Sequence, residues 1–217
     1  MRFYRSAMVG AALFIGLSGT QFAYADTFHA AVSPLPKLVR QQMQAYTWRP
    51  SCPVSLNDLA YVKLSYWGFD QKTHVGVLIV NKQRVNDIVK IFSNLYDDKF
   101  PLKSMKPMYF YRGDDDKSMA DNNTSAFNCR PITGTTHKFS QHSYGTAVDI
   151  NPLINPYVKG ETVLPPAGAK YLNRTQVQPG MITANSHIYQ LFTAAGWQWG
   201  GSWQSLKDYQ HFEKPLT

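Results

Sequence analysis

Apolar and polar residues alternate in one stretch of the chain in the way that a β-strand requires, and a second stretch close by is also rich in strand-forming residues. Residues 59–67 read LAYVKLSYW and residues 74–81 read HVGVLIVN, and both stretches are rich in β-branched and aromatic side chains. The polar segment GFDQKT lies between them. Two such runs joined by a short polar turn are typical of a hairpin, so the pattern predicts an antiparallel β-hairpin here.

Three other segments follow the 3.6-residue period of an amphipathic helix. They cover residues 37–46, 85–98 and 185–197, and the last begins at an N-cap residue, Asn185 or Ser186. We expect the apolar side chains of each segment to face the core. In chain order these are Leu38, Met43 and Tyr46; Val85, Ile88, Val89, Phe92, Leu95 and Tyr96; and Ile188, Leu191, Phe192 and Ala195.

The rest of the chain predicts short strands separated by long loops. Strands are expected at MKPMYFYRG (105–113), TAVDINPL (146–153) and DYQHFEKP (208–215). Residues 113–130 read as a polar loop with three consecutive acids, a run that is more often solvated than a calcium site. Residues 151–182 contain five prolines and read as a second long loop. This order predicts an α+β fold with a small, mostly antiparallel sheet and helices on one side.

The first 25 residues carry the pattern of a secretory signal peptide. Residues 2–5 hold two arginines, residues 7–17 are apolar, and residues 23–25 read AYA, which predicts cleavage after Ala25. The apolar stretch has about 11 residues, whereas a membrane span needs about 20. We therefore expect an exported protein without a stable membrane span, located in the periplasm or outside the cell.

Charge and cysteine content agree with export. The formal net charge is +8, and loss of two arginines with the signal peptide lowers it to +6. No lysine or arginine block is dense enough to predict nucleic-acid binding, so this charge is either a solvated surface or an attraction for an anionic cell-wall polymer. Cys52 and Cys129 are the two cysteines. In an exported protein such a pair favours a disulfide over two unrelated buried thiols.

Two histidines stand next to carboxylates at the edges of predicted strands. His142 precedes Asp149 in the stretch SQHSYGTAVDIN, and His211 follows Asp208 in DYQHFE. A carboxylate in the apolar run AVDI is costly to bury unless a positive group meets it. Two imidazoles and one carboxylate are three of the four positions of a catalytic zinc site. A His–Asp hydrogen bond in the core is the alternative.

The longer sequence motifs around these residues resemble those of the M15 family of zinc peptidases. SQHSYGTAVDIN matches Ser-x-His-x-x-Gly-x-Ala-x-Asp, and residues 197–213 match Trp-x-Trp-Gly-Gly-x-Trp followed by Asp-x-x-His-Phe-Glu. The segments CPVSLNDLAYVKLSYWGFD and NTSAFNCRPITG are similar to a carboxypeptidase-like branch of that family. The resemblance implies that His142, Asp149 and His211 bind zinc and that Asp208 is the general base.

The same resemblance implies roles for further residues. Arg130 would steady the substrate carbonyl, with Arg112 as a competitor for that role. Ser140 and Trp203 would contact substrate, although Trp203, like Trp199, is also suited to packing. Glu213 would orient a liganding histidine. Gly145 would allow a close approach of the backbone to the site.

These observations predict a zinc metallopeptidase that hydrolyses peptidoglycan stem peptides. A D-alanyl-D-alanine carboxypeptidase is the preferred hypothesis. The alternatives are an endopeptidase that cuts L-Ala-D-Glu or a cross-bridge, and a non-catalytic cell-wall binding module. The expected organisation is a signal peptide (1–25), a lead-in segment (26–50) and the catalytic domain (51–217). The scissile bond and the oligomeric state stay open.

Overall fold

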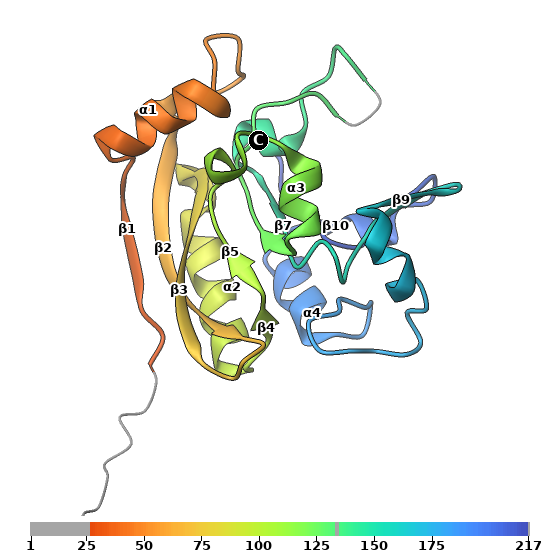
Figure 1. Ribbon diagram of the computed structural model, residues 1–217. Helices are drawn as coiled ribbons and strands as arrows, with labels where there is room; N and C mark the ends of the chain where they lie inside the picture. Colours follow the sequence, from red (N-terminus) through yellow and green to blue (C-terminus); the bar gives the residue numbers. More distant parts are fainter. Residues whose placement is uncertain (1–26, 133–134, 217) are drawn as a thin grey trace, which may run out of the picture.

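The computed structural model describes residues 27–132 and 135–216 and has an α+β fold, as predicted (Figure 1). The signal peptide expected at 1–25 lies outside the described residues. Within the described part of the chain, no helix is long and apolar enough to cross a membrane.

The largest sheet is built on the predicted hairpin. It contains β1 (Ala30–Pro34), β2 (Leu59–Gly68), β3 (Thr73–Asn81) and β4 (Pro101–Leu102). β2 pairs antiparallel with β1 and with β3, and it pairs in parallel with β4 at its far end. Helix α2 (Val85–Asp97) covers one face of this sheet (Figure 1).

Alternate residues of the hairpin enter two different hydrophobic clusters. Val62 and Leu78 pack with α2, whereas Leu59 and Ile79 pack on the opposite face. Each of these four side chains is at most 2% exposed. The hairpin is therefore buried on both faces, which explains why its sequence is nearly continuously apolar.

A short helix and a disulfide close the second cluster. Helix α1 (Lys37–Tyr46) buries Met43, but Leu38 is 75% exposed and Tyr46 is 43% exposed, so the prediction that they face inward was wrong. Met43 and the partly buried Val39 are the α1 side chains that pack on the second cluster. The predicted bond between Cys52 and Cys129 is present, with the two Cα atoms 6.0 Å apart.

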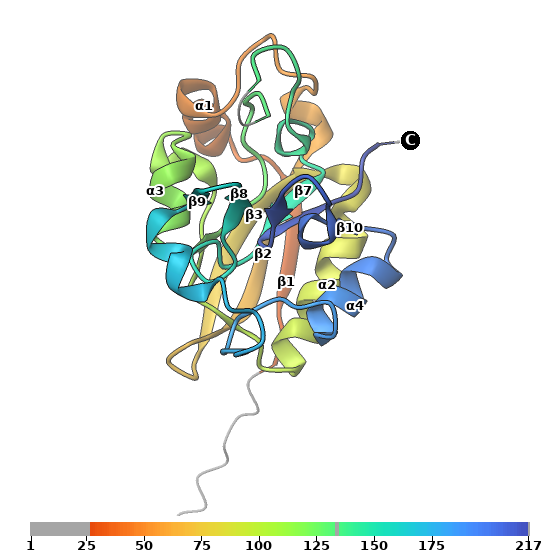
Figure 2. The same cartoon turned by 90° about the vertical axis from the view of Figure 1, so that its right-hand side faces the viewer.

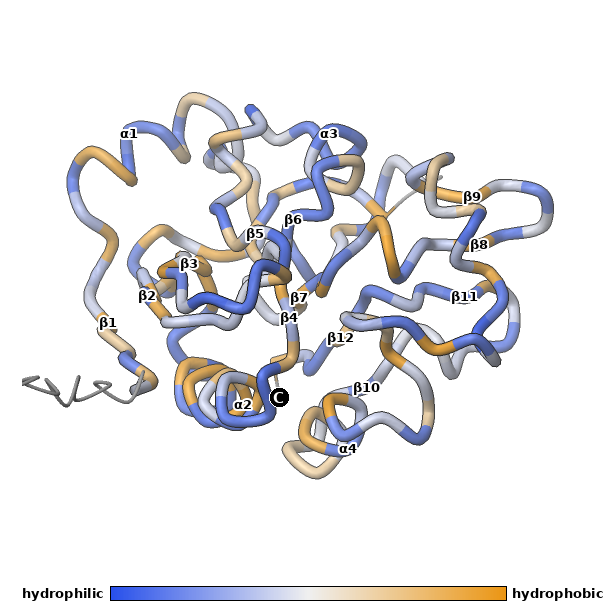
Figure 3. The backbone as a smooth tube through the Cα atoms, turned by 60° about the horizontal axis from the view of Figure 1, so that its bottom comes forward, coloured by the Kyte–Doolittle hydropathy of each residue, from blue (hydrophilic) through white to orange (hydrophobic). Residues whose placement is uncertain are grey.

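The remaining strands form three small sheets in the described part of the chain. The first holds β10 (Gln198–Trp199), β12 (His211–Glu213) and β7 (Ala147–Asp149); the second β11 (Lys207–Asp208), β8 (Tyr157–Lys159) and β9 (Thr162–Leu164); the third β5 (Ser104–Met105) and β6 (Asn123–Thr124). Helix α4 (His187–Ala194) lies beside α2 (Figures 1 and 2). Figure 3 looks along these two helices, where hydrophobic and hydrophilic segments alternate around each coil.

Short 3-10 helices connect many of these strands. They are η1 (Leu56–Asp58), η2 (Lys82–Arg84), η3 (Met108–Tyr111), η4 (Gln141–Tyr144), η5 (Pro166–Tyr171) and η6 (Gly200–Ser202). The strand predicted at 105–113 is instead β5 followed by η3. Pro107 stands at the start of η3 and lacks the N–H that a strand ladder needs.

Both predicted long loops contain regular structure. Residues 113–130 include helix α3 (Asp115–Ala120) and strand β6, and the residues after α3 are mostly buried. Residues 151–182 include β8, β9 and η5. The polar composition of these segments predicted solvated loops. Instead, Asn123 and Asn155 are buried and bond to main-chain groups that would otherwise lack partners.

Candidate metal centre

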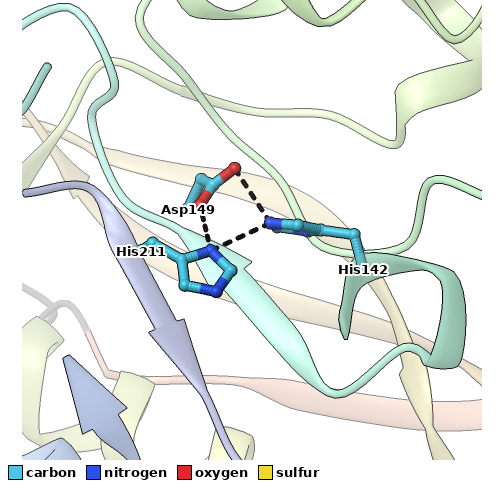
Figure 4. Close-up of side chains that lie close together, drawn as sticks. All are labelled: His142, Asp149 and His211. Carbon is cyan, nitrogen blue, oxygen red and sulfur yellow. Dashed lines mark hydrogen bonds and ion pairs between the residues drawn. The ribbon is translucent and has the colours of Figure 1, made fainter. Parts of the chain in front are cut away.

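Two of the three candidate ligands are cross-strand neighbours. Strands β7 and β12 pair antiparallel, and their register places Asp149 opposite His211. The Nδ1 atom of His211 lies 3.0 Å from Oδ1 of Asp149. Figure 4 shows both side chains projecting from these two strands toward the same point. The sequence separates these residues by 62 positions, and strand pairing brings them together.

The third candidate ligand comes from the helical turn before β7. His142 lies in η4, and the side chain of Ser140 caps that turn by accepting a hydrogen bond from the His142 N–H at 3.3 Å. Gly145 ends the turn with φ 69°, and its backbone packs against Asn81 of β3. The close approach at Gly145 is therefore to the main sheet, which fixes the turn, and not to the site itself as predicted.

Each histidine turns one ring nitrogen toward the other candidate ligands and its second ring nitrogen toward a hydrogen-bond acceptor outside the group. Nε2 of His142 lies 3.1 Å from Oδ2 of Asp149 and 3.1 Å from Nδ1 of His211 (Figure 4). The outward Nδ1 of His142 is 2.6 Å from the carbonyl of Ala126, and the outward Nε2 of His211 is 2.9 Å from Glu213. These acceptors select the tautomers that leave the inner nitrogens unprotonated for a metal.

This donor set fits zinc. The inner atoms of His142, Asp149 and His211 all lie within 4.8 Å of one another. Two imidazoles and a carboxylate with open space beside them are the ligands of a catalytic zinc site, where a fourth position is left for water or substrate. The resemblance-based ligand set is thus brought together in space.

The charges at this centre are tightly linked. Burial favours neutral forms, but hydrogen bonds to Asp149 and Glu213 outweigh it and raise the pKa of His211 to about 10. Burial would also raise the pKa of Asp149, yet the two neighbouring histidines hold it well below its usual range. Without a metal the centre therefore holds a proton on His211, so metal binding must displace that proton.

Asp208 lies on β11, beside the metal candidates, and lines the same cleft. Burial raises the pKa of Asp208 to about 6 although the positive charge of His211 opposes this. Its Oδ1 atom is buried and has no hydrogen-bond partner in the described part of the protein. Gly200 permits this placement, because a Cβ there would lie 2.7 Å from the Asp208 Cβ.

The two arginines that compete for the carbonyl-binding role occupy different surroundings. Arg130 lines the cleft together with the metal candidates and pairs with Asp115. Arg112 does not line the cleft, and its guanidinium lies 5.7 Å from the ring centre of Tyr46. Of the two, Arg130 is therefore the one whose side chain shares the cleft with the metal candidates.

The cleft has a volume of about 580 Å³ and is the space in which these groups meet. Ser140 and Trp203 line it, and the Trp203 ring centre is 5.4 Å from that of His211. Trp199 is 6% exposed and donates its indole N–H to the carbonyl of Tyr209, which is a packing role.

Sequence reasoning missed two groups that support the site. The backbone carbonyl of Ala126 meets His142, and a carbonyl partner leaves no trace in residue type. Asp115 was interpreted as part of a solvated acidic run, yet it faces Arg130. Its position at the first turn of a helix capped by Asp114 was a readable signal for order, although the arginine partner was not.

Comparison with known proteins agrees with this geometry. The searches of curated proteins and of solved structures each gave no match. A family model described as D-alanyl-D-alanine carboxypeptidase matches residues 133–214, a segment that contains the three metal candidates and Asp208. The match supports the resemblance drawn from the motifs. Residues 133–214 of this chain are therefore similar to M15 peptidases.

Proposed function

We propose that this protein is an exported zinc D,D-carboxypeptidase that removes the terminal D-alanine from peptidoglycan stem peptides. The observation that carries this proposal is the convergence of His142, Asp149 and His211 in one cleft with Asp208 and Arg130. A family match to a D-alanyl-D-alanine carboxypeptidase supports the substrate class. The disulfide supports an oxidising compartment, such as the periplasm or the extracellular space.

Three side chains hold the metal in this proposal. His142 and His211 ligate through their inner nitrogens, and Asp149 ligates through its carboxylate. When bound, zinc would lower the pKa of a water molecule and polarise the scissile carbonyl. Ala126 and Glu213 keep the two imidazoles in the required orientation by accepting their outward N–H groups.

Asp208 is the proton carrier. Its free Oδ1 atom accepts a proton from the attacking water as the new C–O bond forms. The same carboxyl then gives that proton to the departing amine as the C–N bond breaks. A general base works best when its pKa lies near the working pH, and burial raises the pKa of Asp208 in that direction.

Arg130 binds the carbonyl oxygen of the scissile bond. Negative charge builds on this oxygen during attack, and a fixed cation in a cleft sheltered from water stabilises it. Ser140 and Trp203 line the same cleft and form the walls against which the stem peptide lies. No nucleophilic side chain is needed, since water is the attacking group.

Digestion of purified muropeptides by the mature protein tests this function. The digest is read by mass spectrometry with zinc present and again after a chelator has removed it. Loss of a single C-terminal alanine that depends on zinc is the expected result. Cleavage after the first L-alanine would instead make the protein an endopeptidase, and binding without cleavage would make it a cell-wall binding module.

A further inference from the structure

The backbone of Arg130 is held on the segment that carries His142. The Arg130 N–H donates to Oγ of Ser143 at 2.9 Å, and the Arg130 carbonyl accepts from the N–H of Ser140 at 3.0 Å. Cys129, the preceding residue, is bonded to Cys52. The starting point of the arginine side chain is thus fixed relative to the metal centre, but its long side chain has several rotatable bonds and needs a tether of its own.

Asp115 supplies that tether from helix α3. Its Oδ2 atom forms an ion pair with Nε of Arg130. Its Oδ1 atom accepts a hydrogen bond at 2.8 Å from the side-chain amide of Asn128. Asn128 is 3% exposed, and its backbone N–H donates to the carbonyl of His142 at 3.2 Å. Both oxygens of Asp115 are therefore occupied by groups that belong to the site segment.

The remaining donors of Arg130 are left for a ligand. A guanidinium carries five N–H groups in a rigid plane. Nε faces Asp115, and Nη1 donates to the carbonyl of Pro131 at 3.2 Å. Nη2 meets no acceptor within residues 27–132 and 135–216. Because the guanidinium is rigid, fixing its Nε also fixes the direction of the Nη2 N–H groups.

We propose that Asp115 is a positioning residue, which holds the guanidinium of Arg130 so that its free N–H groups face the scissile carbonyl. This inference rests on the proposed function, in which Arg130 binds that oxygen. In this proposal Asp115 is the one residue of the acidic run at 114–116 that acts on the site. Asp114 caps α3 and pairs with Lys117, and Asp116 has no ion-pair partner among the described residues.

Stability separates a positioning carboxylate from a merely structural one. Removing one partner of a buried ion pair is strongly destabilising, because the other charge stays unpaired. The side chains of Asp115 and Arg130 are 29% and 26% exposed, so water can solvate the guanidinium when its partner is removed. Asp115→Asn is therefore expected to change the melting temperature little while it lowers turnover.

The experiment compares Asp115→Asn with Glu161→Gln, which removes an exposed carboxylate that does not line the cleft. We expect kcat on a stem peptide to fall about 10- to 100-fold for Asp115→Asn, because a reacting group misplaced by about 1 Å costs up to that factor. KM, zinc content and melting temperature should stay near wild type. Glu161→Gln should keep wild-type kcat. Equal losses in the two variants would overturn the proposal.

A double-mutant cycle with Arg130→Ala separates positioning from any independent effect. If Asp115 acts through Arg130, adding Asp115→Asn to Arg130→Ala should lower kcat no further. Losses that multiply in the double variant would show that Asp115 acts by another route and would overturn the inference.

A second readout does not depend on activity, so it remains informative even if the protein cleaves no stem peptide. The intact, disulfide-bonded, zinc-loaded protein is treated with phenylglyoxal, and modification of each arginine is followed by peptide mapping. Asp115→Asn should speed modification of Arg130 severalfold and leave Arg112 unchanged. An unchanged rate at Arg130 would refute positioning, whereas absent hydrolysis with a changed rate would refute only the proposed function.

Discussion

The sheet that contains β2 and β3 and the small sheet that contains β7 and β12 differ in almost every respect. β2 and β3 pair along nine residue pairs, and their side chains are buried on both faces. β7 and β12 pair along three residue pairs, yet they supply two of the three metal candidates. The long sheet and α2 carry none of the proposed site residues.

This difference shows how the molecule separates stability from chemistry. Apolar burial stabilises the fold in proportion to the area removed from water, and the long hairpin with α2 provides much of it. Buried histidines and carboxylates cost free energy unless they are paired, so the site is built from short elements held by neighbours. Changes in the first region should alter stability, and changes in the second should alter catalysis.

Asp208→Ala should have the largest effect on catalysis. It removes the proton carrier but none of the metal ligands, so we expect zinc content to stay at one ion per chain while kcat falls about 10²- to 10⁴-fold. Metal analysis and hydrolysis of a stem peptide measure the two quantities. The control is Glu161→Ala, which removes an exposed carboxylate outside the cleft and should keep wild-type kcat. Wild-type turnover in Asp208→Ala would show that the base has been assigned wrongly.

Phe92→Ala tests the other side of the comparison. Phe92 is 1% exposed and lies in the cluster between α2 and the sheet. Removing such a ring leaves a cavity and lowers the free energy of unfolding by about 3–5 kcal/mol. Denaturant unfolding measures this loss. At a temperature where the variant remains folded, kcat should match wild type, and a large fall in kcat would mean that the two regions are not separable.

Arg130→Ala should reduce kcat about 10²- to 10³-fold, the usual effect of removing a donor to a developing negative charge. Arg112→Ala is the matched control, because Arg112 stacks near Tyr46 and does not line the cleft. It should keep wild-type kcat. The opposite pattern would exchange the roles of the two arginines.

Glu213→Ala should weaken zinc binding without removing a ligand. Glu213 accepts the outward N–H of His211, and loss of such a partner costs about 10- to 100-fold in metal affinity. Competition with a chromogenic chelator gives the dissociation constant. Glu161→Ala removes an exposed carboxylate from the turn between β8 and β9 and serves as the control. Equal zinc affinities in the two variants would show that Glu213 does not orient His211 for metal binding.

The sequence predicted the first region better than the second for a physical reason. Strands 59–67 and 74–81 and the helix at 85–98 have local patterns that agree with their tertiary surroundings, and all three are present. The segment 105–113 has strand-forming residues, but Pro107 and the turn at Arg112, with φ 55°, give it another shape. Local preference was overruled there by backbone constraints.

The candidate site was predictable only where side-chain identity carries the chemistry. His142, Asp149 and His211 were found from their residue types and spacing, and the fold brings them together. The partner relation between Asp115 and Arg130 was not found, because it joins a helix start to a distant segment. No periodic pattern marks such a contact, so the acidic run was interpreted as solvated.

The response of the protein to pH tests the same comparison through the metal centre. In the metal-free protein the pKa of His211 is raised to about 10 from an ordinary value of 6.5. A raised pKa means that the proton stabilises the fold, fully below about pH 6.5 and less and less as the pH rises toward 10. Thermal unfolding with a chelator should therefore show lower stability at pH 9 than at pH 6.

Zinc binding should respond to pH with the opposite sign. Because the metal must displace the proton on His211, zinc affinity should rise by about tenfold per pH unit below that pKa. Competition titrations between pH 6 and pH 8 measure this slope, with zinc speciation controlled by the competing chelator. His187→Ala, which removes an exposed histidine paired with Asp98, should leave the slope unchanged. A flat affinity profile in the wild type would mean that no proton leaves the centre, and His211 would then bind zinc from an already neutral state.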